Sequence, residues 1–284
     1  MNQVNARHRV YFAAVAILAL WVGVWGYFVP SHVDVALPWL VPPLHARFLG
    51  AMYLSGTTFM LGCLLARQWA EVRVVLPMIA IWTGMLLIVS LLHLSEFNPA
   101  VPPTYVWFAA YFFYPLIALW LAWRHRRAAP PDPASASRVP WVVRLYLLAQ
   151  GALVTVLALA LLLAPSLMTA LWPWPITPLL AQLYSAPFLS YGLGSLLLAG
   201  RQTWLETRIA LTAMWVFAVG VLIASLIHHA LFTFSAPATW LWFAAFATAT
   251  FALAFLSVLA WLSDAQLPRA RFGRGAARQP SSAR

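Results

Sequence analysis

The sequence alternates long apolar runs with short polar segments. The runs are about 20 residues long, and a helix of that length, rising about 1.5 Å per residue, crosses the roughly 30 Å hydrocarbon core of a bilayer. Membrane β-strands would instead alternate apolar and polar residues over about ten positions, and these runs do not alternate. The pattern predicts an all-α membrane helix bundle, with transmembrane helices at about residues 10–29, 44–66, 74–94, 104–123, 145–164, 179–200, 209–229 and 239–262.

The last four runs repeat the first four at a distance of 135 residues. Without a gap, His93 aligns with His228, and a W-x-E-x-R motif aligns Trp69, Glu71 and Arg73 with Trp204, Glu206 and Arg208. Because each copy has an even number of crossings, both copies enter the membrane from the same side. The repeat therefore predicts eight transmembrane helices in a tandem 4+4 arrangement, related by a pseudo-twofold axis along the membrane normal.

The repeat divides the chain into four parts. Residues 1–123 and 141–263 are the two four-helix membrane modules. Residues 124–140 form a cytoplasmic linker, in which arginine, proline and small residues replace the apolar pattern. Residues 264–284 form a basic tail with too few apolar groups to bury a core, so we expect this tail to be disordered.

The charge of the chain comes from arginine, and its distribution predicts the orientation. The sequence has 17 arginines, no lysine and a formal net charge of +11. All arginines except Arg47 fall on the side that holds the N-terminus, the linker and the tail, and the positive-inside rule places that side in the cytoplasm. Anionic lipid headgroups are the expected partners there, and nucleic acid is not. Arginine in place of lysine suggests a GC-rich genome, hence a bacterial inner membrane.

Motifs that would indicate catalysis are missing from the sequence. It has no glycine-rich phosphate loop, no His-Glu-x-x-His and no Gly-x-Ser-x-Gly. Its single cysteine, Cys63, excludes an intramolecular disulfide. No acidic residue lies in the middle of an apolar run, where proton-coupled pumps usually carry one. The sequence therefore indicates neither an enzyme nor proton-driven transport.

The repeated histidines are the first candidate for a site. His93 and His228 lie near the outer ends of the third and seventh predicted helices. Two imidazoles from different helices could ligate a haem b iron or a divalent metal. The alternative is that each imidazole bonds to a loop carbonyl after its own helix. We expect the latter, with the rings more than about 10 Å apart, too far to share one ion.

A second candidate is a polar cluster at the outer side of the first copy. Its members, proposed as ligand-binding residues, are His32, Asp34, His45, Arg47, His93 and Glu96. Three of the six aligned positions in the second copy are leucine, and none of the six is aspartate, glutamate or arginine. An arginine inside a span is costly unless it is paired or faces water, so we expect Arg47 and Glu96 to form a partly buried ion pair. A solute vestibule or a divalent metal site are the alternatives.

The W-x-E-x-R motif is interpreted as a structural clamp at the cytoplasmic side. Topology accounts for the arginines and the membrane interface accounts for the tryptophans, but neither accounts for glutamate. We expect Glu71 and Glu206 to pair with the repeated Arg9 and Arg144, or with Arg73 and Arg208 of the motif itself. The six structural residues are therefore Trp69, Glu71, Arg73, Trp204, Glu206 and Arg208.

Small residues four positions apart indicate where helices approach closely. Ala51 and Ser55 in the second predicted helix repeat as Ala186 and Ser190 in the sixth. Such spacing lets membrane helices come together, so we expect these two helices to form the central contact of the bundle.

The composition favours an apolar ligand. The chain has 16 Trp, 17 Phe and 9 Tyr and no charge in the middle of its apolar runs. The leading hypothesis is binding or transport of a small apolar or lipid-like molecule in a cleft between the two modules. The alternatives are a haem- or metal-binding redox protein that uses His93 and His228, and a non-catalytic subunit of a homo- or hetero-oligomeric membrane complex.

Overall fold

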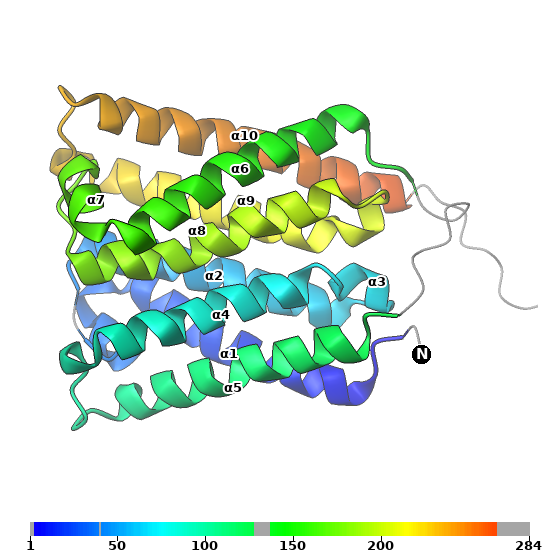
Figure 1. Cartoon of the computed structure of the whole chain (residues 1–284), viewed down its shortest axis with the longest axis horizontal. Helices are drawn as coiled ribbons and strands as arrows, with labels where there is room; N and C mark the ends of the chain where they lie inside the picture. Colours follow the sequence, from blue (N-terminus) through cyan, green and yellow to red (C-terminus); the bar gives the residue numbers. More distant parts are fainter. Residues whose placement is uncertain (1–2, 40, 128–136, 266–284) are drawn as a thin grey trace, which may run out of the picture.

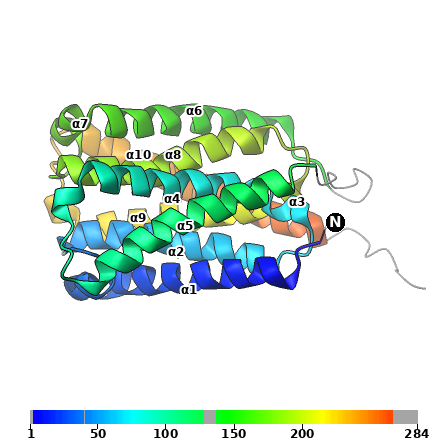
Figure 2. The same cartoon turned by 60° about the horizontal axis from the view of Figure 1, so that its bottom comes forward.

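The computed structural model describes residues 3–39, 41–127 and 137–265, and its helices run side by side along one axis (Figures 1 and 2). The long helices are α1 (Ala6–Phe28), α2 (Pro43–Leu65), α4 (Val75–Leu92), α5 (Pro102–Arg124), α6 (Trp141–Leu163), α8 (Pro178–Ala199), α9 (Arg208–Ile227) and α10 (Pro237–Ala265). The short elements are η1 (Pro30–Val35), α3 (Trp69–Val72), η2 (Leu94–Glu96), α7 (Pro165–Leu171), η3 (Trp204–Glu206) and η4 (His229–Leu231). No strand is present in these ranges, apart from two isolated bridges. Most of the predicted linker and nearly all of the predicted tail lie outside the described residues.

Seven helical segments of the described chain are long and apolar enough to cross a membrane, which confirms the prediction of a multi-pass helical membrane protein. They are α1, α2, α5, α6, α9, the segment Trp69–Leu92 that contains α4, and Pro237–Ser263 of α10. The long helix outside this set is α8, the sixth predicted span. Its sequence carries Gln182, Pro187 and three serines, which lower its hydropathy. These polar groups face protein: Ser190, for example, donates to the carbonyl oxygen of Met78 in α4 at 2.8 Å.

The helices of the first half (residues 3–127) pack against the helices of the second half (residues 137–265). Helix α1 packs on α2 and α6 packs on α8, while α5 packs on α4 and α10 packs on α9. The two halves meet because α2 packs on α9 and α4 packs on α8, whereas α2 and α4 of the same half barely touch. The apolar windows of α2 and α4 are 67% and 61% buried, against 28% for both α1 and α5. The outer helices therefore present most of their surface to lipid.

Glycines mark the closest helix contacts. A Cβ atom built on Gly50 in α2 would lie 2.4 Å from the backbone nitrogen of Tyr27 in α1. One built on Gly220 in α9 would lie 2.8 Å from the Cβ of Ala51 in α2. The prediction that the second and sixth helices make the central close contact is wrong. Helices α2 and α8 face each other through large side chains, such as Phe48 and Tyr184 with ring centroids 4.1 Å apart.

The close approach at Gly50 gives a test of this packing. We expect Gly50→Ala to lower the free energy of unfolding by about 1–3 kcal/mol, because the new methyl group collides with α1 backbone, which cannot move aside locally. The matched control is Gly84→Ala in α4, where the nearest atom to the new methyl is 3.7 Å away. The control should melt at the same temperature as the unaltered protein or slightly higher, since alanine favours the helix. Equal melting temperatures for both variants in detergent would contradict the α1–α2 contact.

Candidate functional site

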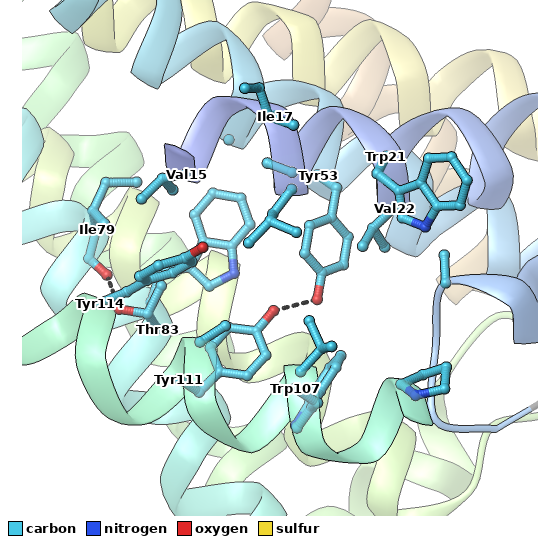
Figure 3. A pocket seen from close by; sticks show the side chains of 18 of the residues that line it. Val15, Ile17, Trp21, Val22, Tyr53, Ile79, Thr83, Trp107, Tyr111 and Tyr114 are labelled. Carbon is cyan, nitrogen blue, oxygen red and sulfur yellow. Dashed lines mark hydrogen bonds between the residues drawn. The ribbon is translucent and has the colours of Figure 1, made fainter. Parts of the chain in front are cut away.

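A cavity of about 460 Å³ lies inside the first half, between α1, α2, α4 and α5 (Figure 3). Its inner wall carries aromatic residues from three helices: Tyr53, Trp82, Trp107, Tyr111 and Tyr114. Its rim carries side chains of α1 and α5 that are exposed on the outside of the bundle. Among them, Ile17 is 67% exposed, Trp21 is 49% exposed and Val106 is 53% exposed. This cavity, named cavity 1, therefore opens sideways, toward the surface that faces lipid.

The way the two halves pack explains this opening. Helix α1 follows α2, and α5 follows α4, because each forms a close pair with its neighbour. Since α2 packs on α9 and α4 packs on α8, the two pairs of the first half diverge from each other. The space between α1 and α5 is left to side chains, which do not fill it.

The second half contains a cavity of about 450 Å³ at the aligned positions, named cavity 2. Its lining comes from α6, α8, α9 and α10 and from the segment around α7. The two cavities differ in their polar groups. Where cavity 1 has Tyr53, Tyr111 and Tyr114, the residues 135 positions later in cavity 2 are Phe188, Phe246 and Ala249. The first half thus offers phenol hydroxyls at a place where the second half offers hydrocarbon.

The polar groups around cavity 1 are few. The hydroxyls of Tyr53 and Tyr111 hydrogen-bond to each other across the cavity wall (Figure 3). Thr83 donates to the carbonyl oxygen of Ile79 at 2.6 Å, and the indole nitrogen of Trp107 donates to Ser90 at 2.8 Å. The tyrosine hydroxyls and the indole N–H of Trp82, which has no hydrogen bond among the described residues, are therefore the groups left to meet a ligand.

Cavity 2 has two polar atoms of a different kind. The indole nitrogen Nε1 of Trp172 and the amide oxygen Oε1 of Gln150 are both buried and have no hydrogen-bond partner among the described residues. The other end of the Gln150 amide donates to Ser195 at 3.2 Å. Both atoms have almost no accessible surface, so neither is presented to the cavity, whose surface is nearly all hydrocarbon.

The outer cluster predicted from the sequence is only partly assembled. His45 is buried and its Nδ1 hydrogen-bonds to the hydroxyl of Tyr184 in α8 at 2.7 Å. His32, Asp34 and Glu96 are exposed. The predicted ion pair between Arg47 and Glu96 is wrong: Glu96 lies in the exposed η2 turn, and no such pair forms within the described chain. Arg47 instead points across the bundle.

The repeated histidines contact the opposite half. Nη1 of Arg47 donates to Nε2 of His228 at 2.6 Å, and Nε2 of His93 bonds to the Gln182 side chain, which stands where Arg47 does in the first half. The prediction that each histidine bonds to a loop after its own helix is wrong. Burial, and then the Arg47 guanidinium, lower the pKa of His228, in keeping with a neutral ring that accepts from arginine. No group of three or more His, Cys, Asp or Glu able to hold a metal occurs among the residues that the structure describes. The separation of the two rings stays a prediction.

Charged pairs also cross between the halves at the arginine-rich end. Glu71 pairs with Arg208 of the second half, and Glu206 lies 3.9 Å from Arg73 of the first half and 3.8 Å from Arg201. Arg9 and Arg144 do not pair with glutamate. They donate to backbone carbonyls at the end of α2 and at the end of α8. Trp69 and Trp204 are both buried beside these pairs. Of the two alternatives for the glutamates, the motif arginines are partners, each from the other half, and Arg201 of the same half is a further partner of Glu206.

The tyrosines of cavity 1 were missed by sequence reasoning. Tyrosine in a membrane helix is common, and nothing in the local pattern marks Tyr53 or Tyr111. The available signal was the comparison of the copies, because an aligned position that is tyrosine in one and phenylalanine in the other differs by a single hydroxyl.

Comparison with known proteins adds no relative. The chain matches no protein-family model, and searches of curated proteins and of solved structures found no significant match. The functional argument therefore depends on the geometry of the site.

The pair of Glu71 and Arg208 can be tested by a double-mutant cycle. Both side chains are nearly buried, with 5% and 12% exposure, so removing one leaves a desolvated charge. We expect Glu71→Gln to lower the free energy of unfolding by about 3–5 kcal/mol, and Glu71→Gln with Arg208→Gln to recover part of that loss. The control is Arg7→Gln at an exposed arginine, which should change stability by less than about 0.5 kcal/mol. Additive losses in the double variant would show that the pair contributes nothing as a pair.

Proposed function

We propose that this multi-pass membrane protein binds small apolar or lipid-like molecules in its two lateral cavities. The observation that carries the proposal is the presence of two mostly apolar spaces of about 460 and 450 Å³ at aligned positions. Pockets for small molecules typically measure about 300–1,000 Å³ and have apolar walls with a few polar groups. Both spaces match that description.

The sequence predicts a ligand cleft between the two modules, whereas each cavity lies within one half. Each cavity is lined by residues of one half only, and exposed side chains of its outer helices form the rim. A molecule dissolved in the bilayer could therefore enter without passing through water. This geometry favours binding from the membrane over transport across it, and the apolar runs contain no mid-span carboxylate that would couple transport to protons.

The same proposal includes eight crossings in a 4+4 parallel repeat, with both termini in the cytoplasm of a bacterium. It is supported by helix starts 135 residues apart, at Ala6 and Trp141, Pro43 and Pro178, and Pro102 and Pro237. Helix α8 has 22 residues and lies alongside the other long helices (Figure 1). The arginines favour contact of the cytoplasmic end with anionic lipids.

The redox alternative receives less support from the contacts. A haem b or metal site built on His93 and His228 would need a free nitrogen on each ring. Nε2 of His228 accepts from Arg47, and Nε2 of His93 bonds to Gln182. Both contacts would have to break for these atoms to ligate an ion.

Photolabelling with plugged variants tests lateral entry. In a bilayer that contains a small apolar diazirine probe, we expect carbene adducts on the buried Tyr53 of cavity 1 and the buried Phe188 of cavity 2. Ala110→Trp should obstruct the mouth of cavity 1 and reduce labelling of Tyr53 at least about fivefold, since Ala110 lines the cavity and the added indole would stand in the path of the probe. It should leave Phe188 unchanged, and Ala245→Trp should do the reverse.

The matched control is Ala109→Trp, one position away on the exposed surface of α5. It should leave labelling of Tyr53 unchanged. Labelling of Tyr53 that persists in Ala110→Trp, or that never exceeds background in the unaltered protein, would contradict entry from the bilayer.

A further inference from the structure

The hydroxyl pair of Tyr53 and Tyr111 leaves one donor unused. Two hydroxyls that bond to each other share one hydrogen, and the second O–H still needs an acceptor. Neither tyrosine hydroxyl has another hydrogen-bond partner among the described residues. The two side chains are only 8% and 6% exposed, so water does not readily supply the missing acceptor. A buried donor without a partner is costly, typically by about 1–3 kcal/mol.

The spare donor lies beside cavity 1, where a ligand could reach it. Both tyrosines line the cavity and their hydroxyls meet at its inner wall (Figure 3). Tyr53 is ten residues after the start of α2 at Pro43, so the pair sits about 15 Å from the outer end of that helix, deep in the apolar layer. The polar end of any ligand that satisfies the donor must therefore be buried as well.

The cavity walls limit the chemistry of that ligand. No charged residue lines cavity 1, so an ionised group such as a carboxylate or phosphate would lose its hydration without compensation. The indoles of Trp82 and Trp107 line the same cavity as the tyrosines, and aromatic surface of this kind suits a planar ring. A neutral acceptor on a planar ring satisfies both features.

We propose that cavity 1 binds a membrane-soluble quinone, whose ring carbonyl oxygen accepts the free O–H of the Tyr53–Tyr111 pair. The proposal rests on the proposed function and adds the class of ligand. The isoprenoid or alkyl tail of such a molecule leaves the cavity between α1 and α5, where Ile17 and Val106 are exposed. Cavity 2 has phenylalanines at the two positions that align with Tyr53 and Tyr111. It should therefore not prefer a quinone over a hydrocarbon that lacks carbonyl groups.

Two probes that differ in their carbonyl groups test the proposal. Decyl-1,4-benzoquinone and decylbenzene are titrated against full-length protein in nanodiscs, and the readout is protection of the Tyr53 and Phe188 peptides from carbene labelling. We expect the quinone to protect Tyr53 with about tenfold higher affinity than decylbenzene, which corresponds to one buried hydrogen bond of about 1.4 kcal/mol. At Phe188 the two probes should protect equally.

Variants locate the effect at the hydroxyl pair. Tyr53→Phe with Tyr111→Phe should remove the preference for the quinone and leave decylbenzene affinity unchanged. Tyr105→Phe, which removes an exposed hydroxyl of α5, should keep the preference. The converse variant, Phe188→Tyr with Phe246→Tyr, places a hydroxyl pair in cavity 2 and should create a preference for the quinone at that site.

The outcomes separate the two proposals. Equal protection of Tyr53 by both probes in the unaltered protein would overturn the quinone proposal and leave the apolar binding function standing. If neither probe protects Tyr53 or Phe188, both proposals are overturned. A preference that survives in the Tyr53→Phe and Tyr111→Phe variant would also overturn the role of the hydroxyl pair.

Discussion

The packing of α2 on α9 and of α4 on α8 is the contact on which the rest of the structure depends. In the apolar layer it is made by close contacts such as Gly220 against Ala51. At the arginine-rich end, Glu71 and Arg208 pair across the halves, and at the other end Arg47 meets His228. Charged contacts between the halves thus lie toward both ends of the helices. In the middle, van der Waals contact is joined by buried hydrogen bonds between Ser55 and Tyr191 and from Ser190 to the Met78 carbonyl oxygen, as expected where lipid removes the hydrophobic driving force.

The two lateral cavities follow from this packing of α2 and α4 on helices of the other half. Because α2 and α4 each pack on the opposite half, their own partners α1 and α5 are separated along the cavity, although the Tyr11 hydroxyl of α1 still donates to the Tyr114 carbonyl oxygen of α5. The resulting space is apolar and faces the membrane surface, which suits a lipid-soluble ligand. Aligned positions then differ between the halves: Tyr53 and Tyr111 line one cavity, whereas Phe188 and Phe246 line the other. The same scaffold can therefore present two sites of different specificity.

The helices could be predicted from the sequence and most of the contacts could not. Apolar run length located all eight long helices within about four residues, because span length is set by membrane thickness. The partner of Glu71 could not be chosen, since a repeated motif offers Arg73 and Arg208 with equal charge. The proposed Arg47–Glu96 pair failed because helix α4 ends at Leu92 and the η2 turn carries Glu96 outward. Cavities are gaps between helices, and no single residue type encodes them. Only the tyrosine-to-phenylalanine difference between copies pointed toward cavity 1.

The packing of α2 on α9 and of α4 on α8 is tested most directly by dividing the chain. If the chain is cut after residue 132, between α5 and α6, the contacts of α2 with α9 and of α4 with α8 remain available to two separate fragments. Co-expressed fragments should purify together in a 1:1 ratio and melt as one unit. Fragment 1–132 alone should aggregate or be degraded, because α2 and α4 would expose their small-residue and charged contact surfaces. A fragment that purifies alone as a stable monomer, with no affinity for the other, would contradict the account.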